Sequence, residues 1–286
     1  MKTICQAIAK TTGRATDFAS ASPIGGGCIN DAHRLETSSG TFFVKQNRTS
    51  FLEAFQVEQL ALQEMADTKT IRVPKPICGG TADGRAFLVL EHIEMGSPGQ
   101  GSQRRAGEQL ANMHRNRGRA FGWHRDNTIG ATPQPNPFTD NWIEFYGEHR
   151  LGFQFNLARQ GGKSFRGADD LLGRLGDYFE GYDPEPSLLH GDLWGGNIGY
   201  DEKHQPVVFD PATYHGDRET DLAFTEMFGG FGPDFYRAYD EAWPRDSGHP
   251  VRKKLYNLYH YLNHHNLFGG GYAGTAQAII NDLLAH

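Results

Sequence analysis

The stretch Leu188-Leu-His-Gly-Asp-Leu-Trp-Gly-Gly-Asn-Ile198, followed by Val207-Val-Phe-Asp-Pro211, decides the fold class of this 286-residue chain. It places Asp192 and Asn197 five residues apart and puts Asp210 at the end of an apolar run. The same offset separates a base from a metal ligand in the kinase pattern H-R-D-L-x-x-x-N. Each piece alone is also compatible with a plain turn or a strand end. Together, with an apolar strand between them, they favour an ATP-dependent phosphotransferase.

The residues of these two stretches have different expected roles. Asp192 is the candidate catalytic base, because a carboxylate within hydrogen-bond reach aligns an alcohol and takes its proton. His190 is expected to hold the loop backbone. Asn197 and Asp210 are the candidate metal ligands, since their oxygens suit Mg²⁺ ions that bridge the phosphates of ATP. The expected cofactors are therefore ATP and Mg²⁺.

A lysine and a glutamate upstream complete the pattern. Lys45 ends the apolar strand segment Phe42-Phe-Val-Lys45, which matches the V-A-I-K type of kinase lysine. Glu58 follows in the next predicted helix and is expected to pair with it, which would aim the ammonium at the α and β phosphates. Glu53 and Glu64 are competing partners on the same helix. The alternative is a surface lysine beside an ordinary helical glutamate.

A glycine run lies one strand pair before this lysine, in Pro23-Ile-Gly-Gly-Gly-Cys-Ile-Asn30. Gly25, Gly26 and Gly27 would let backbone N–H groups approach a phosphate closely. The G-x-G-x-x-G spacing is absent, and a glycine run is often a plain hairpin turn. Cys28 would lie beside the same amides, which favour a thiolate. This suggests a redox-sensitive residue able to cross-link two chains, although a small apolar packing residue is the more common case.

The hydrophobic periodicity predicts mainly strands first and helices later. Strands are expected at 16–24, 28–37, 41–46, 76–80, 86–92 and 206–209. Helices are expected at 2–12, 51–66, 101–117, 139–160, 167–181, 219–227, 232–243, 250–267 and 274–284. Ser50 is the expected N-cap of the second helix, with Glu53 completing a capping box. This order predicts an α+β, bilobal, protein-kinase-like fold, with a small antiparallel β lobe that has one main helix and a larger, mainly helical lobe.

The connector Met95–Gly101 is rich in Gly, Pro and Ser and is the candidate lobe boundary. Residues 1–94 are then the ATP-binding lobe, and residues 95–286 the catalytic and substrate lobe. Main-chain groups of Glu91 and Ile93, at the end of the last strand before the connector, are expected to bind the adenine.

Composition excludes several other classes of protein. The net charge of −6 argues against a nucleic-acid surface. Three cysteines without C-x-x-C spacing suggest neither a disulfide framework nor a zinc site. We find no apolar run long enough to span a membrane and no secretory pattern at the first residues, so a cytoplasmic protein is expected. Either a monomer or a homodimer is compatible with the sequence.

At these motifs the chain resembles the fructosamine kinase family (fructosamine/ketosamine-3-kinases), which is related to aminoglycoside and choline kinases. The resemblance runs almost end to end, and the tryptophan of H-G-D-L-W-x-x-N makes it more specific than H-G-D alone. It implies phosphorylation of the 3-hydroxyl of ketosamines, free or protein-linked, after which the adduct decomposes and frees the amine (deglycation). The matching segments are Gly26–Asn30, Phe43–Lys45, Arg72–Pro76, Asn127–Gly130, Gln134, Asn136, His190–Asn197, Asp210–Ala212, Met227–Phe231 and Leu262–Tyr272.

One segment departs from the family pattern. The family reads Y-G-H-x-E-x-D-L after its D-P-A, whereas this chain has Tyr214-His-Gly-Asp-Arg-Glu-Thr-Asp-Leu222. The transposition puts a role for His215 in doubt. Glu219 and Asp221 still match, and they could support the metal loop or simply begin a helix, where acids suit the N-terminal dipole.

The acceptor site is expected to combine hydrogen-bonding side chains with an aromatic wall. The candidates are Trp194, His264 and Phe231, although a tryptophan in the catalytic loop could equally pack in the core. His260 and His264 lie four residues apart on one helix face, but without a third ligand we favour hydrogen bonding or core packing over zinc.

Two other functions remain open at this point. An aminoglycoside- or choline-type small-molecule kinase would keep the chemistry and change the acceptor. A catalytically silent nucleotide-binding module would not need the base, so the complete set of Lys45, Asp192, Asn197 and Asp210 argues against it. A protein Ser/Thr kinase is disfavoured because H-G-D and D-P-A replace H-R-D and D-F-G.

Overall fold

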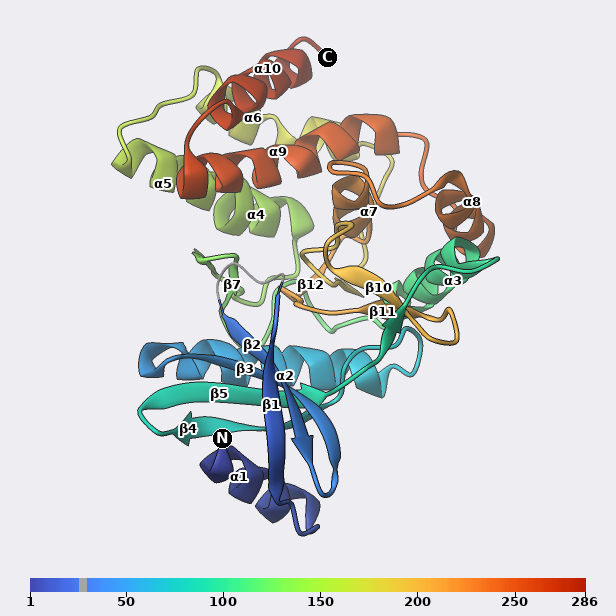
Figure 1. Cartoon of the computed structure of the whole chain (residues 1–286). Coiled ribbons are helices and arrows are strands. Elements are labelled where there is room, and N and C mark those ends of the chain that lie inside the picture. The colour runs from blue at the N-terminus through green and yellow to red at the C-terminus, as the bar shows by residue number, and fades with distance from the viewer. Residues whose placement is uncertain (26–29) are drawn as a thin grey trace. The chain divides into compact units, whose positions relative to one another are not determined.

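The computed structural model describes residues 1–25 and 30–286, which form two compact units (Figure 1). The first unit contains Met1–Ser102 and Gly199–Pro211, and the second contains Gln103–Ile198 and Ala212–His286. The chain therefore returns once to the first unit, directly after the segment that carries Asp192. The expected assignment of ATP binding to residues 1–94 and of catalysis to 95–286 stays a prediction.

The first unit is built on a five-stranded antiparallel sheet with the strand order β1-β2-β3-β5-β4. Its strands are β1 (Phe18–Ile24), β2 (Asp31–Thr37), β3 (Gly40–Arg48), β4 (Pro76–Ala82) and β5 (Arg85–Glu91). Asp83 and Gly84 join β4 to β5 with φ angles of 51° and 75°, the left-handed pair that a two-residue hairpin turn requires. All five strands were predicted from the sequence, with small differences at their ends.

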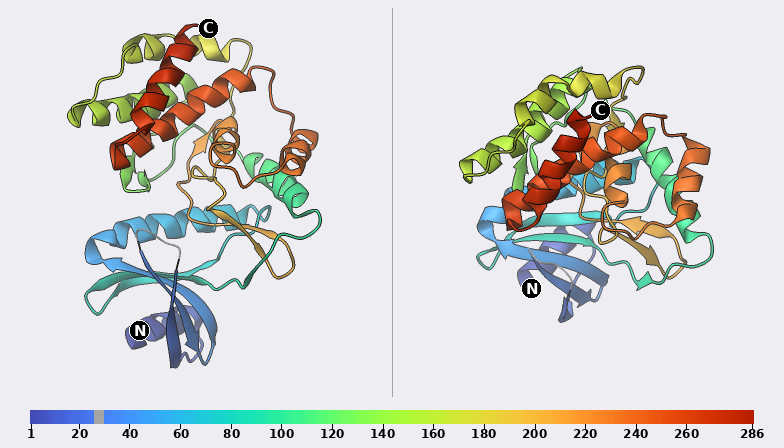
Figure 2. Two further views of the ribbon diagram at one scale, coloured as in Figure 1. Left: turned by 45° about the horizontal axis from the view of Figure 1, so that its top comes forward. Right: turned by 90° about the horizontal axis from the view of Figure 1, so that it is seen from above.

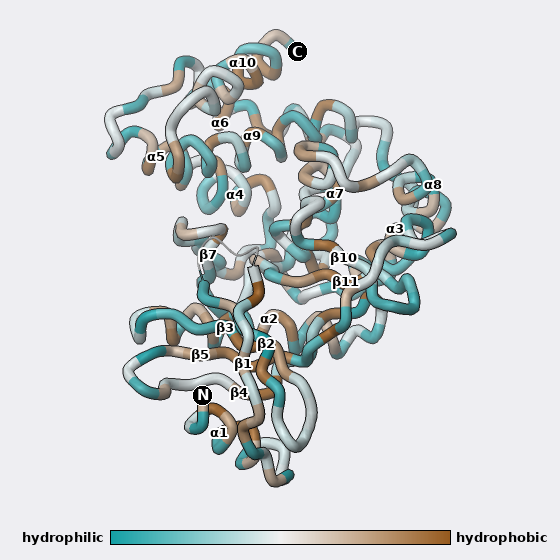
Figure 3. The backbone as a smooth tube through the Cα atoms, viewed as in Figure 1, coloured by the Kyte–Doolittle hydropathy of each residue, from teal (hydrophilic) through white to brown (hydrophobic). Residues whose placement is uncertain are grey.

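Two helices cover this sheet, α1 (Lys2–Thr12) and α2 (Leu52–Asp67), and Figure 1 shows them on its two sides. Ile4 and Ile8 of α1 belong to one buried cluster with Val44 of β3 and Val89 of β5. Successive strand residues point to opposite faces, so Lys45 points toward α2. Figure 3 shows hydrophobic residues recurring along α2 and the neighbouring strands, and α2 buries Phe55, Leu62 and Met65 among others.

The start of α2 differs from the prediction. Thr49–Phe51 form a 3₁₀ turn, and the amide of Leu52 donates to the carbonyl of Thr49. No side chain caps α2, so the predicted N-cap role of Ser50 was wrong. In the tighter 3₁₀ turn the carbonyl of Thr49 is the acceptor, in place of the side chain of Ser50.

The second unit is mainly helical, and its helices agree in order with those predicted. They are α3 (Ser102–His114), α4 (Trp142–Tyr146), α5 (Phe153–Gln160), α6 (Ala168–Gly173), α7 (Glu219–Thr225), α8 (Pro233–Ala242), α9 (His249–Phe268) and α10 (Tyr272–Leu284). A π-helical segment, Gly147–Gly152, joins α4 to α5, and a 3₁₀ turn, Leu175–Phe179, follows α6. Figure 2 shows α10 lying along α9, which also contacts α5 and α7.

Several short strands frame the catalytic loop, and most of them were not predicted. The segment 189–197 lies between β9 (Ser187–Leu188), which pairs with β12 (His215–Gly216), and β10 (Ile198–Asp201). β10 pairs with β6 (Met95–Gly96) and β11 (Pro206–Val208) in the first unit, where only β11 was expected. A further hairpin joins β7 (Asn127–Ile129) to β8 (Thr132–Gln134). Within the described ranges, no helix has both the length and the apolar character needed to cross a membrane.

Candidate active site

Lys45 is the centre of a buried ion-pair cluster in the first unit. Its Nζ lies 2.6 Å from Glu58 Oε1 of α2 and 2.5 Å from Asp210 Oδ1. Burial disfavours the charged ammonium, but the two carboxylates outweigh this and hold the pKa of Lys45 above its ordinary value. Of the three glutamates considered on this helix, Glu58 is therefore the partner, as predicted, and not Glu53 or Glu64. The lysine is charged and held in place before any phosphate arrives.

We expect Lys45→Met to lower the free energy of unfolding by about 3–5 kcal/mol, because it leaves the buried Glu58 carboxyl without its cation. Burial already raises the pKa of Glu58. Adding Glu58→Gln should therefore recover much of the stability without restoring ATP affinity. Urea unfolding and calorimetric titration with ATP measure the two effects. Equal stability of the single and double variants would contradict this account.

Asp210 follows β11 and has a φ of 57°, in the left-handed region that aspartate tolerates better than most residues. Its side chain is 51% exposed even though one oxygen contacts Lys45. The carboxylate is thus presented outward on a constrained backbone, as a metal ligand requires.

Asn197 and Asp192 are hydrogen-bonded to each other in the second unit. Asn197 Nδ2 donates to the main-chain carbonyl of Asp192 at 2.8 Å and to its Oδ2 at 3.0 Å. These bonds engage the amide nitrogen, so Oδ1 is the atom of Asn197 that would act as the predicted metal ligand. An amide oxygen and the carboxylate of Asp210 are the hard donors that Mg²⁺ prefers, so the residues fit this ion.

The backbone around Asp192 is fixed by its own loop. The amide of Asp192 donates to His190 Nδ1 at 3.3 Å, and the carbonyl of His190 accepts from Ala212 at 2.9 Å. Gly191 has a φ of 81°, and a Cβ there would lie 2.1 Å from the carbonyl oxygen of Ala212. The glycine of H-G-D is therefore required by a close backbone approach, and His190 holds the loop, as expected.

Asp221, near the start of α7, binds the backbone of this loop through its carboxylate. Its carboxylate accepts from the amides of His190 at 2.7 Å and Gly191 at 2.9 Å, and contacts His114 Nε2 at 3.1 Å. Burial would raise the pKa of Asp221, but the bonds to His114 and the loop outweigh it and keep the pKa below its ordinary value. Burial lowers the pKa of His114, whose Nδ1 contacts Tyr239 Oη at 2.8 Å. No sequence signal marked His114 for this role.

Two other residues of the segment 214–222, which differs from the family pattern, have structural roles. Glu219 is fully buried and pairs with Arg252 of α9, with Nε to Oε2 at 2.9 Å. It therefore begins α7 and supports α9, while Asp221 alone of the two contacts the catalytic loop. The ring of His215 packs against Gly118. A Cβ at position 118 would lie 2.6 Å from Cγ of His215, so only glycine leaves room for this ring.

The expected adenine-binding segment is ordered by bonds within the first unit. The amide of Glu91 donates to the carbonyl of Lys75 at 2.8 Å, and its carboxylate pairs with Arg72. The expected binding of adenine by main-chain groups of Glu91 and Ile93 stays a prediction. Gly25 follows β1. The predicted phosphate-binding residues Gly26, Gly27 and Cys28, and with them the redox hypothesis for Cys28, lie outside the described residues.

Two of the three predicted acceptor residues come together in the second unit. The ring of Phe228 lies 6.0 Å from that of Trp194 and 5.4 Å from that of His264. Phe231 packs on Phe235 of α8 at 4.7 Å, and its acceptor role stays a prediction. Trp194 is 38% exposed, so it is not a core residue, and its place in the acceptor wall stays a prediction.

The neighbouring histidine pair divides between core and surface. His260 stacks on Phe224 with ring centroids 3.5 Å apart, and burial lowers its pKa to about 3. Its carbonyl accepts the Nδ1 proton of His264 at 2.7 Å. In the neutral form of the ring, Nε2 carries the lone pair and is suited to accept a bond from a hydroxyl. Hydrogen bonding and core packing, as favoured from the sequence, describe the pair.

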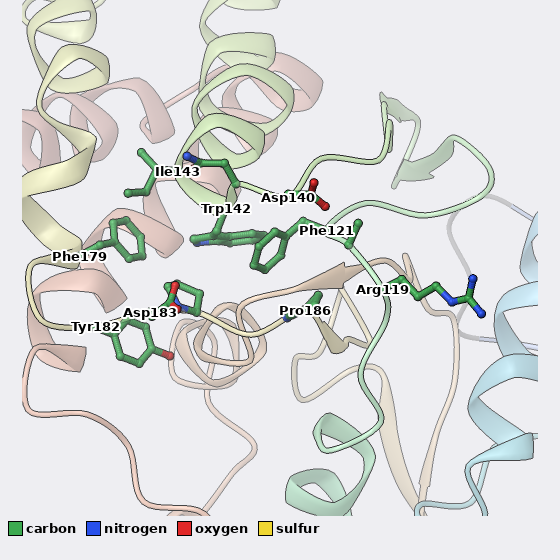
Figure 4. Close-up of a pocket in the computed structure, with 12 residues that line it drawn as sticks. Arg119, Phe121, Asp140, Trp142, Ile143, Phe179, Tyr182, Asp183 and Pro186 are labelled. Carbon is green, nitrogen blue, oxygen red and sulfur yellow. The ribbon is translucent and has the colours of Figure 1, made fainter.

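Two cavities in the second unit contain none of the predicted site residues. Figure 4 shows one of about 370 Å³, where Phe121, Trp142, Phe179 and Tyr182 form the aromatic part of the lining. The other, of about 510 Å³, is lined by His265, Asn266 and Gly269 among other residues.

Comparison with known proteins assigns these features to a family. Residues 1–286 match the family model described as fructosamine kinase. A protein of Synechocystis sp. named as a probable ketoamine kinase is 47% identical over 284 residues, which cover 99% of this chain and 96% of that protein. A chloroplastic protein-ribulosamine 3-kinase of Arabidopsis thaliana is 45% identical over 280 residues, with coverage of 96% and 85%.

A solved structure agrees with the sequence comparison. A crystal structure from Haemophilus somnus assigned as a fructosamine-3-kinase has a TM-score of 0.90 and 31% identity to this chain. The match covers 98% of this chain and 96% of that one.

Proposed function

Because this chain belongs to the fructosamine kinase family and is a phosphotransferase acting on a hydroxyl group of ketosamines, we propose that it phosphorylates their 3-hydroxyl with MgATP. The fold is that of the protein-kinase-like phosphotransferases, and use of ATP with a metal ion follows from it. The names of the relatives and the chemistry of the site support the finer statement. Freeing of the amine after phosphorylation, and hence repair of glycated protein, is the proposed consequence.

The observation that carries the residue roles is the double hydrogen bond from Asn197 Nδ2 to Asp192. It joins the proposed base to a proposed metal ligand, so the acceptor hydroxyl and the metal are positioned by one loop. In the proposed reaction Asp192 takes the hydroxyl proton while the hydroxyl oxygen bonds to the γ-phosphorus and the bond to ADP breaks.

The remaining roles divide between charge neutralisation and recognition. Asn197 and Asp210 would hold Mg²⁺, which neutralises the phosphate charge when bound. Lys45, kept in place by Glu58, would contact the α and β phosphates, and Gly25–Cys28 would cover them. Main-chain groups of Glu91 and Ile93 would bind the base.

On the acceptor side, Trp194 and Phe228 would form the wall on which the sugar lies, and His264 Nε2 would accept from one of its hydroxyls. A secondary amine is cationic at neutral pH, and a cation above an aromatic face is attracted by it.

A comparison of acceptors tests the proposal. ATP consumption is measured with ribulosamines, fructosamines, an aminoglycoside and choline, and the product is analysed by phosphorus NMR. We expect turnover only with the two ketosamines and a phosphate coupled to the proton at carbon 3. Turnover of the aminoglycoside or choline alone, or a phosphate at another carbon, would reject the assignment.

A further inference from the structure

A line of aromatic side chains extends away from the catalytic loop on the second unit. We define the aromatic strip as Trp194, Phe228, His264, Phe268 and Tyr272. The ring centroid of His264 lies 5.4 Å from that of Phe228. His264 also contacts Phe268 at 5.9 Å and Tyr272 at 5.1 Å. The strip therefore begins two residues from Asp192 and continues to the end of α9 and the start of α10 (Figure 1).

The strip is unusually exposed for its composition. Seven large hydrophobic side chains are exposed in residues 1–25 and 30–286, and three of them are Trp194, Phe228 and Phe268. Phe268, the outermost, is 69% exposed. Exposed apolar groups scattered singly need no explanation, but a contiguous patch at a proposed substrate site indicates a binding surface.

Buried side chains also support the aromatic strip. Phe228 contacts Phe224, which is buried and stacked on the buried His260. His264 donates to the carbonyl of His260, which fixes its ring. Gly230 contacts the catalytic loop so closely that a Cβ there would lie 2.7 Å from Gly195 Cα. The positions of the exposed rings are therefore fixed before a ligand binds.

The strip is longer than a sugar. An extended chain of five or six carbons is about 5–6 Å from end to end, given a C–C bond of about 1.5 Å and tetrahedral angles. This is close to the 6.0 Å between the rings of Trp194 and Phe228. Phe268 lies two further ring contacts beyond Phe228, so a sugar whose hydroxyl reaches Asp192 leaves the outer rings uncovered. What continues from the sugar is the amine and the group that carries it.

Resting on the proposed function, we propose that the outer end of the aromatic strip, Phe268 and Tyr272, is a subsite for the polypeptide that carries the ketosamine. The methylene stem of a lysine and its neighbouring residues would pack on these rings. The subsite favours protein-linked ketosamines over adducts of small amines, and Phe268 is the residue that distinguishes them.

The test compares one ketose attached to propylamine with the same ketose attached to the lysine of a short peptide. We expect Phe268→Ala to lower kcat/KM for the peptide adduct about tenfold, mostly through KM, and to leave the propylamine adduct unchanged. Phe138→Ala is the matched control, since Phe138 is also in the second unit and is 62% exposed but lies outside the strip. It should affect neither adduct.

Three outcomes would overturn the inference. Equal loss with both adducts would place Phe268 in the sugar site or in the fold, and no loss with either would remove it from recognition. A shift from dimer to monomer in Phe268→Ala, seen by light scattering, would show that a second copy of the chain covers the strip. Calorimetric binding of the two adducts without ATP separates this inference from the proposed function, because a peptide preference that depends on Phe268 can be measured even if no phosphate is transferred.

Discussion

Asp192→Asn is expected to lower kcat for a ketosamine by about 10²- to 10⁴-fold while leaving ATP affinity within a factor of two of the unchanged chain. The amide cannot take the proton of the acceptor hydroxyl. It keeps the size of the carboxylate and one oxygen that can accept from Asn197 Nδ2. The loss should therefore appear in kcat, because the geometry of the loop and the nucleotide side is retained.

The measurement combines ATP consumption with calorimetric titration of ATP. Asp183→Asn is the matched control, since this exposed aspartate of the second unit lines the cavity of Figure 4 and not the catalytic loop. Retained turnover in Asp192→Asn would reject the base assignment. A loss of ATP binding equal to the loss of kcat would assign Asp192 to the nucleotide instead.

Asp221→Ala is expected to produce the second large effect, on stability and activity together. It removes a buried carboxylate that receives the amides of His190 and Gly191 and contacts His114. Removing one member of such a buried charged network costs about 3–5 kcal/mol of unfolding free energy. The two freed amides lie immediately before Asp192, so we also expect kcat to fall with little change in KM.

Glu219→Gln separates the positioning role from a merely structural one. Glu219 is also a buried acid of α7, but its carboxylate pairs with Arg252 and His249 of α9 instead of the catalytic loop. We expect this variant to lose stability and to keep kcat per folded molecule. Thermal unfolding and steady-state kinetics below the transition measure both. A normal kcat in folded Asp221→Ala would show that the loop holds Asp192 without this anchor.

The parts of the site that depend on local pattern were predictable. Lys45 could be singled out because it follows the apolar residues Phe42-Phe-Val within one strand. Asp192, Asn197 and Asp210 could be singled out because their spacing is set within one loop and the strand that follows. The helices of the second unit were found because hydrophobic residues recur at helical intervals over long segments.

The parts that failed share a different physical cause. Ser50 was assigned as a cap because its side chain suits one, but the backbone of a 3₁₀ turn provides the acceptor instead. The two-residue strands β9 and β12 have too few residues for a periodic signal and exist because they pair with each other. The loop sequence alone does not separate Phe228 from Phe231. The structure places Phe228 beside Trp194 and packs Phe231 on Phe235, and the acceptor role of Phe231 stays a prediction.

The sequence by itself predicted the phosphotransferase chemistry of this protein, because the proposed base, the two proposed metal ligands and the lysine have characteristic spacings, which are local properties of the chain. Only the tertiary structure decided which partners hold them. Glu58 was one of three candidate acids, and Asp221 with His114 reaches the catalytic loop from segments far away in the sequence. Such contacts depend on how helices pack, and the energy of a buried charge depends on every group around it. The aromatic strip likewise depends on how α9 and α10 pack. It is the feature from which we infer a preference for protein-linked acceptors.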